Sequence, residues 1–210
     1  MNNKMSQPGT YACELKQRLQ RNVPGGCHTY AKGEDQFPEF APPFIVRGNG
    51  CHVWDLEGCE FIEYGMGLRA VTLGHAFVPV VESVVQQLSS GTNFTRPAPI
   101  EVDCADQFLE LVPTAEMVKF CKDGSDAVDG AIRLARAYTG RDMVAICGDH
   151  PFFSTNDWFI GTTEMNAGIP EATRRLVVKF KYNDPASLEN LFAQYPNQIA
   201  CVVMEAARTE

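Results

Sequence analysis

The sequence predicts an α/β fold, in which a mostly parallel sheet is flanked by helices and is preceded by an N-terminal helix and a small antiparallel meander. In the second half of the chain, short apolar runs alternate with helical segments, as in parallel strands that are buried on both faces. Nearer the N-terminus, glycine turns separate three short apolar runs, as in paired antiparallel strands. Composition agrees, since 45% of the 210 residues are hydrophobic and 21% are charged, as in an ordinary globular chain.

Residues 1–70 are expected to form the N-terminal helix and the meander. Helical periodicity covers 10–21, with Thr10 as the expected N-cap. A connector rich in proline and glycine follows over 23–43. Three apolar runs, separated by Gly48-Asn49-Gly50 and Glu57-Gly58, are then expected to pair as strands: 44–47, 51–55 and 59–64.

Residues 71–210 are expected to form the N-terminal part of a larger domain. Apolar residues three and four positions apart predict helices over 78–88 and 100–112. Further along, the pattern predicts strands over 117–121, 143–147, 176–180 and 199–204, with helices over 127–138 and 185–192. Because only six residues and no covering helix follow the last strand, we expect this domain to be incomplete.

Charge and cysteine usage narrow the class of function. The 26 acidic residues outnumber the 18 basic ones, and the basic residues are scattered, which disfavours a nucleic acid partner. The eight cysteines form no C-x-x-C pair and no signal peptide is evident, so we expect reduced thiols and a cytoplasmic protein. No apolar run approaches the ~18 residues of a membrane span, and the histidines lack partners at metal-ligand spacing. We therefore expect neither a membrane nor a metal partner.

The most informative stretch lies between the strand over 117–121 and the helix over 127–138. Asp123, Gly124 and Ser125 stand where the unpaired amides of a first helical turn follow the end of a strand. Such amides, together with the Ser125 hydroxyl and an approachable glycine, can hold a phosphate monoester. The alternative is that Ser125 or Asp123 simply caps the helix.

A glycine-rich loop at 65–70 allows two interpretations. Its sequence Gly-Met-Gly-Leu-Arg-Ala matches the G-x-G-x-x-G/A fingerprint of dinucleotide-binding domains and follows a strand. Gly74 breaks any helix start, and the acidic residue expected about 20 positions on would fall in a helix, which disfavours a nicotinamide cofactor. Arg69 in this loop is either a cation that grips a substrate carboxylate or phosphate, or a solvated surface residue.

Aromatic residues crowd the loop after the strand over 143–147, at the edge where open α/β sheets bind ligands. They are Phe152, Phe153 and Trp158. An aromatic residue there either stacks on a planar cofactor ring or packs in the core. His150 in the same loop is a candidate proton carrier or a structural residue. Glu205 and Glu210 follow the last strand and are expected at the same edge of the sheet.

Several stretches are specific enough to compare with known families. They are Val-Pro-Gly-Gly at 23–26, Val-Trp-Asp at 53–55 with Phe-Ile-Glu-Tyr at 61–64, Leu-Gly-His-Ala at 73–76, Glu-Met-Val-Lys-Phe at 116–120, and Ile-Arg-Leu-Ala-Arg-Ala-Tyr-Thr-Gly-Arg at 132–141. Together they resemble the N-terminal half of class III, pyridoxal-phosphate-dependent aminotransferases, most closely the glutamate-1-semialdehyde 2,1-aminomutase branch. The resemblance covers 20–210 and implies an incomplete transferase fold of the aspartate aminotransferase type, with pyridoxal 5'-phosphate (PLP) as cofactor.

The resemblance also implies which residues hold the cofactor. Asp123-Gly124-Ser125 matches the family's Ser-Gly-Thr loop, which receives the cofactor phosphate, and Asp126 matches the glutamate after it. Aspartate in place of serine at position 123 is a departure, because a carboxylate beside a phosphate repels it unless it is turned away. The family's Tyr-His-Gly, whose aromatic residue stacks on the pyridine ring, matches Phe152-Phe153-Ser154 if one residue is inserted before it and Pro151-Phe152-Phe153 if not, and Phe152 is the expected stacking residue. Glu205 matches the glutamate of a Glu-Pro motif, although Ala206 replaces the proline.

By the same resemblance, the protein transfers an amino group to or within a small aldehyde or ketone and is a homodimer. Arg69 and Glu210 are the candidate substrate contacts. The family's Schiff-base lysine lies beyond Glu210, so we expect no catalytic residue in these 210 residues and no activity from them alone. Divergence at 65–70 and after His150 favours a substrate other than glutamate semialdehyde. The competing hypothesis is a non-catalytic, truncated relative that binds PLP weakly or only pairs with partner chains.

Overall fold

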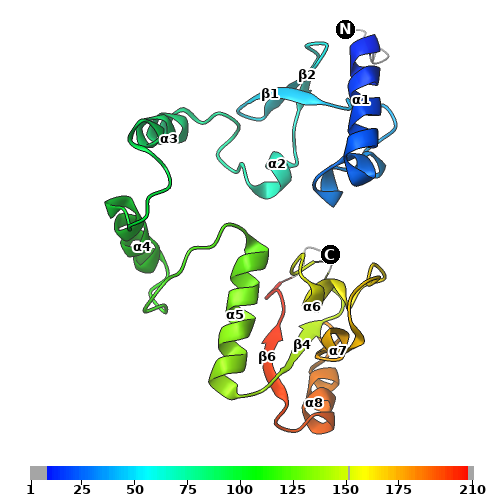
Figure 1. Ribbon diagram of the computed structural model, residues 1–210, viewed down its shortest axis with the longest axis vertical. Helices are drawn as coiled ribbons and strands as arrows, with labels where there is room; N and C mark the ends of the chain where they lie inside the picture. The colour runs from blue at the N-terminus through cyan, green and yellow to red at the C-terminus, as the bar shows by residue number, and fades with distance from the viewer. Residues whose placement is uncertain (1–8, 151, 208–210) are drawn as a thin grey trace. The chain divides into compact units, whose positions relative to one another are not determined.

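The computed structural model describes residues 9–150 and 152–207, and its elements form two compact units, residues 1–97 and 98–210 (Figure 1). The first unit contains a helix and an antiparallel sheet, and the second contains a parallel sheet with helices. The α/β architecture predicted above is therefore confirmed. A domain boundary at residue 70 stays a prediction. Within the described ranges, no helix has the length and apolar character needed to cross a bilayer.

Helix α1, Thr10–Asn22, opens the first unit. The expected Thr10 cap is wrong, because Thr10 is already the first helical residue and Gly9, which has no side chain to offer, holds the N-cap position. Three short 3-10 helices occupy the connector: η1 Pro24–Gly26, η2 Tyr30–Lys32 and η3 Glu34–Gln36. An ion pair between Lys16 and Glu34 joins α1 to η3. Because this pair is exposed, it contributes no more than about 1 kcal/mol.

An antiparallel sheet of three strands follows, in the order β1-β2-β3, which confirms the predicted meander. The strands are β1 Ile45–Asn49, β2 His52–Asp55 and β3 Glu60–Ile62. Val53 in the central strand is buried. The Asp55 carboxylate accepts hydrogen bonds from the backbone N–H groups of Glu57 and Cys59 at 3.0 and 2.8 Å. These two bonds hold the turn between β2 and β3.

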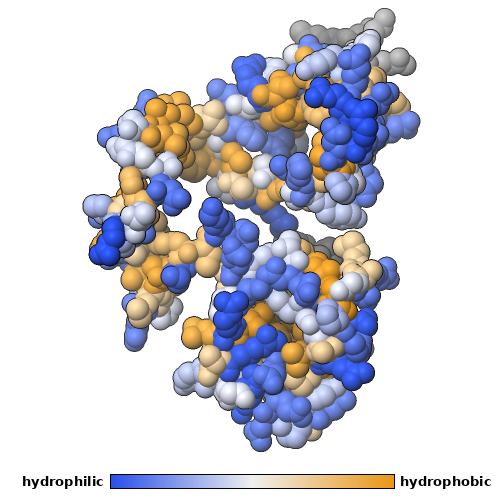
Figure 2. Space-filling model, viewed as in Figure 1, coloured by the Kyte–Doolittle hydropathy of each residue, from blue (hydrophilic) through white to orange (hydrophobic). Residues whose placement is uncertain are grey.

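Helix α3, Val78–Ser90, belongs to the first unit and α4, Pro99–Leu111, to the second, close to the bounds predicted from periodicity. Each keeps an apolar stripe exposed, which Figure 2 shows as orange surface over both helices. The exposed residues include Val81, Val84, Val85 and Leu88 on α3, and Ile100, Val102 and Leu111 on α4. The stability of either helix therefore depends little on these side chains within the described chain.

The sheet of the second unit consists of three parallel strands in the order β5-β4-β6. They are β4 Met143–Cys147, β5 Val177–Phe180 and β6 Ile199–Val203. Val144 pairs with Val177 on one side and with Cys201 on the other. Every residue of β4 is buried, because this strand is central and covered on both faces. The parallel sheet is confirmed.

Helices cover both faces of this sheet. On one face, Ile132 of α5, Gly124–Thr139, packs with Val144 and Ile146. On the other face, Leu188 and Leu191 of α8, Pro185–Gln194, pack on a second buried cluster that includes Ala145 and Phe180. Full burial of an aliphatic or aromatic side chain contributes about 1.5–3 kcal/mol. The short helices α6, Asp157–Ile160, and α7, Glu171–Arg174, complete the unit.

The predicted strand over 117–121 is wrong, because that segment forms no strand. Met117 is 88% exposed and Phe120 is about half exposed. A strand needs a neighbouring backbone to pair with, and among the described residues no strand pairs with this segment. Phe120 instead makes an edge-to-face contact with Phe108 of α4, with ring centroids 5.9 Å apart.

Candidate cofactor site

The first turn of α5 is the segment for which the sequence predicts a phosphate-binding helix start. Asp123 is the N-cap, and its carboxylate accepts a hydrogen bond from the Asp126 backbone N–H at 2.9 Å. The capping alternative is thus confirmed for Asp123. A Cβ added at Gly124 would meet no atom within 4 Å, so the backbone there is open to approach. The carboxylate of Asp123 nevertheless takes up one of the amides that a phosphate would use.

Ser125 connects this helix start to the aromatic loop. Its Oγ accepts a hydrogen bond from the backbone N–H of Thr155 at 3.0 Å. A serine hydroxyl has one O–H donor as well as its acceptor lone pairs. The bond from Thr155 therefore leaves the Ser125 O–H available to donate to an anion.

The three aromatic residues of the loop after β4 do not share one role. Trp158 is buried at 7% exposure, and Phe153 packs against the same core cluster, so the core-packing alternative is right for these two. Phe152 is 52% exposed and touches Phe159 only through an edge-to-face contact, with centroids 5.6 Å apart. Of the three, Phe152 has a ring with surface free to stack on a ligand.

His150 and Glu205 meet where the carboxyl ends of β4 and β6 lie side by side. The backbone N–H of Glu205 donates to His150 Nδ1 at 3.1 Å, and the ring is buried at 5% exposure. This bond fixes the orientation of the imidazole ring between the two strand ends. The Glu205 side chain itself is exposed. His150 therefore has a structural role, because its buried ring joins the two strand ends. Glu210, the other predicted site residue after β6, lies outside the described residues.

Sequence reasoning missed Asp129, the residue that holds the loop over α5. Its carboxylate accepts hydrogen bonds from Trp158 Nε1 at 2.6 Å, Asn156 Nδ2 at 2.5 Å and Ser154 Oγ at 3.4 Å. One sequence feature could have indicated this contact, the spacing of Asp129 from Ser125, because residues four apart on a helix lie on the same face. Asp129 stands four positions after Ser125, so both had to face the same neighbour.

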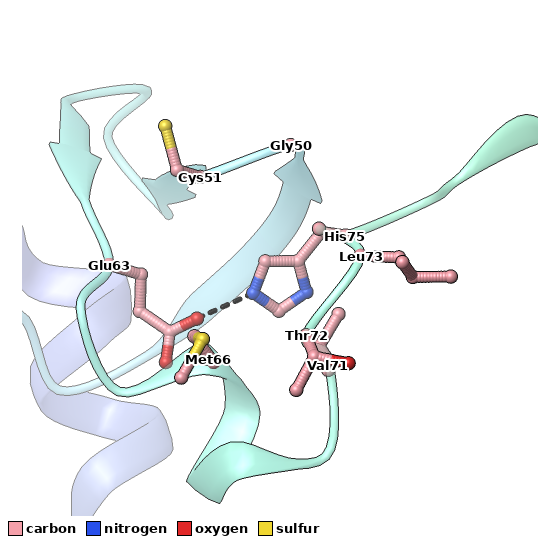
Figure 3. A pocket seen from close by; sticks show the side chains of 9 residues that line it. Gly50, Cys51, Glu63, Met66, Val71, Thr72, Leu73 and His75 are labelled. Atoms are coloured by element: carbon pink, nitrogen blue, oxygen red, sulfur yellow. Dashed lines mark hydrogen bonds and ion pairs between the residues drawn. The ribbon is translucent and has the colours of Figure 1, made fainter.

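A pocket in the first unit surrounds a histidine–carboxylate pair. Glu63 and His75 are hydrogen bonded through Oε2 and Nε2 at 2.6 Å (Figure 3). The Gly67 N–H donates to Glu63 Oε1 at 2.9 Å. The bonds from His75 and Gly67 lower the pKa of Glu63 below its usual value. Further lining residues are Gly50, Cys51, Met66 and the stretch 71–74.

The glycine-rich loop at 65–70 forms a left-handed turn, not a helix start. Element α2, Met66–Arg69, has φ values of 46°, 57°, 61° and 70° along its four residues. Left-handed geometry costs about 1–2 kcal/mol for each residue other than glycine, and the Glu63 bond to Gly67 helps to offset it. This geometry opposes the dinucleotide interpretation, which needs a right-handed helix to begin here. Arg69 is exposed and forms no ion pair within the described part of the chain.

Comparison with known proteins adds the decisive observation, since the sequence model of class-III aminotransferases matches residues 29–210. The chain belongs to the class-III aminotransferases. Its fold agrees, because the chain superposes on the PLP internal aldimine form of the FumI protein of Sphingopyxis sp. MTA144 with a TM-score of 0.84 and 31% identity. That alignment covers 92% of this chain and 46% of the FumI chain. The partial aminotransferase fold predicted above is thereby confirmed.

Two other relatives match this class-III aminotransferase chain over most of its length. The glutamate-1-semialdehyde 2,1-aminomutase of Sulfurihydrogenibium sp. YO3AOP1 is 33% identical over 98% of this chain and 48% of that protein. An omega-transaminase from Sphaerobacter thermophilus is 29% identical over 96% of this chain and 48% of its own, with a TM-score of 0.83. The chain thus spans about half the length of the curated relatives it matches.

Proposed function

We propose that this chain is the N-terminal part of a PLP-dependent aminotransferase or aminomutase that moves an amino group to or within a small aldehyde or ketone. The observation that carries the proposal is the Thr155 N–H bond to Ser125 Oγ, which brings a helix N-terminus and an aromatic loop into one site. When bound, PLP supplies an electron sink for the reacting carbon. Residues of this chain would bind and orient it.

The residues present fit the cofactor in part. Gly124 is open to approach, and Ser125 has a free O–H donor at the positive end of a 16-residue helix, features that suit a phosphate. Phe152 offers an exposed ring to the pyridine, and Glu205 follows β6 at the same sheet edge. The Asp123 carboxylate opposes the phosphate charge, so we expect the affinity of this chain for PLP to be weakened.

Substrate contacts are proposed in addition. Arg69 carries an exposed guanidinium on a structured turn, which suits a carboxylate or phosphate on the substrate, and Glu210 is the second candidate. The loops at 65–70 and after His150 diverge from the aminomutase pattern. This divergence favours a small carbonyl substrate other than glutamate semialdehyde, such as an amino-sugar precursor. We further propose that the protein is a homodimer.

Cofactor titration tests the proposal. PLP is titrated into the chain by calorimetry, with pyridoxal, which lacks the phosphate, as the comparison ligand. Binding of PLP at least about tenfold tighter than pyridoxal is expected if α5 holds the phosphate. Equal affinities, or PLP binding that Ser125→Ala and Phe152→Ala both leave unchanged, would overturn the assigned site.

A further inference from the structure

Three donors from one loop converge on a single carboxylate of α5. Trp158 Nε1, Asn156 Nδ2 and Ser154 Oγ all donate to Asp129. Ser154 is completely buried, and its Oγ also accepts the Asn156 backbone N–H at 3.1 Å. We infer that Asp129 is a positioning residue for the cofactor site, fixing the aromatic loop over the first turns of α5. This inference rests on the proposed function.

The geometry explains why a carboxylate is suited to this position. A carboxylate accepts hydrogen bonds at two oxygens and donates none, so it can receive an indole, an amide and a hydroxyl together. Hydrogen bonds to an ionised acceptor are roughly twice as strong as neutral ones. Loss of Asp129 would leave buried donors without an acceptor, which is costly where water cannot replace it. The loop would then have to move to satisfy them.

Movement of the loop would alter both parts of the candidate site. The Ser125–Thr155 bond depends on where Thr155 lies, and Thr155 stands between Ser154 and Asn156, two of the residues bound to Asp129. Phe152 precedes the same segment by two residues. Asp129 therefore acts on the ring contact and on the phosphate contact through the loop, without touching either ligand group.

Hydrogen exchange in the full chain tests this inference without cofactor. Asp129→Ala is expected to speed exchange of the Thr155 and Asn156 amides by about tenfold or more, while the amides of β4 keep their protection. Asp157→Ala is the matched control, because Asp157 is an exposed carboxylate next to Trp158 with no side-chain hydrogen bond recorded among the described residues. Unchanged exchange of the loop amides in Asp129→Ala would overturn the inference.

Two further variants keep the test decisive. If Asp129→Ala unfolds the unit, Trp158→Phe removes one donor while keeping an aromatic ring, and faster loop exchange is still expected. The double variant Asp129→Asn with Asn156→Asp reverses donor and acceptor between the two residues. It is expected to restore the protection of the loop amides from hydrogen exchange, relative to Asp129→Asn alone. If neither variant behaves in this way, Asp129 is not what fixes the loop.

A PLP titration of the same variants separates the two proposals. Asp129→Ala is expected to weaken PLP binding by about tenfold. The PLP affinity of Asp157→Ala is expected to stay within about twofold of that of the unmodified chain. Faster loop exchange with unchanged PLP affinity would restrict Asp129 to a structural role and overturn its link to the cofactor. Failure of the unmodified chain to bind PLP would contradict the proposed function, and the exchange data would then decide on Asp129 by themselves.

Discussion

The Thr155 backbone N–H donates to Ser125 Oγ at 3.0 Å across thirty positions of sequence. This bond uses the serine as an acceptor and orients its hydroxyl at the start of α5. A backbone amide and a helix N-terminus are thereby placed around one oxygen atom.

Ser125→Ala is expected to weaken PLP binding by about tenfold, because it removes both the hydroxyl donor and the acceptor of the Thr155 N–H. Calorimetric titration measures the change. Ser83→Ala, which alters an exposed serine on α3, serves as the control and is expected to leave affinity unchanged. Equal affinities for the two variants would remove Ser125 from the site.

Phe152→Ala is expected to lower PLP affinity by about twofold to tenfold, since stacking of aromatic groups contributes about 0.5–1.5 kcal/mol. The free energy of unfolding should change little because the ring is half exposed. Phe192→Ala on α8 removes a ring of similar exposure, at 45%, and is the matched control. A larger loss of PLP affinity in Phe192→Ala than in Phe152→Ala would contradict the stacking role.

Asp123→Ser is expected to strengthen PLP binding. The substitution removes a carboxylate that would repel the phosphate and frees the Asp126 amide from it. Serine caps helices about as well as aspartate, so the stability of α5 should be maintained. Titration at low and high salt checks the cause, because relief of repulsion gives a gain that shrinks as salt rises. Unchanged affinity would show that the Asp123 carboxylate faces away from the phosphate, and a loss of affinity would contradict the expected repulsion.

Acid pH is expected to loosen the turn at Met66–Arg69. The pKa of Glu63 is lowered in the folded state by the bonds from His75 and Gly67, while the unfolded value is about 4.3. The ionised carboxylate therefore stabilises the fold fully above the unfolded value, and this contribution is lost as the pH falls through the folded pKa. Urea unfolding between pH 7 and pH 3 measures it.

Glu63→Gln should remove this part of the pH dependence, and Glu82→Gln on the exposed surface of α3 should keep it. Identical pH profiles for the unmodified chain and Glu63→Gln would show that the Glu63 carboxylate has no such role.

Ile146→Ala is expected to lower the free energy of unfolding by about 2–5 kcal/mol, because Ile146 is fully buried in the central strand. Val84→Ala on the exposed stripe of α3 should change it by about 0.5 kcal/mol or less. Urea denaturation compares the two variants. A cost at Val84 close to that at Ile146 would mean that the stripe is covered in solution.

The candidate site was predicted from the sequence only in its local parts. The cap at Asp123 and the open glycine beside it could be inferred because a helix start is specified by adjacent residues. The spacing of Asp129 from Ser125 indicates a shared helix face, but its three hydrogen-bond partners could not be inferred, since they stand 25, 27 and 29 positions away in the chain. Similarly, the sequence placed three aromatic residues in one loop, and only their burial separates Phe152 from Phe153 and Trp158.

The sequence by itself determined where most helices and strands lie, as at β4, whose predicted and observed bounds coincide at Met143–Cys147. Periodicity and turn residues act over a few positions, so they can be read without a partner. Only the tertiary structure decided that 117–121 stays unpaired, that 66–69 winds left-handed, and that Ser125 meets Thr155. Each of these depends on hydrogen bonds to particular partner residues, or on their absence, and local propensity does not specify those partners.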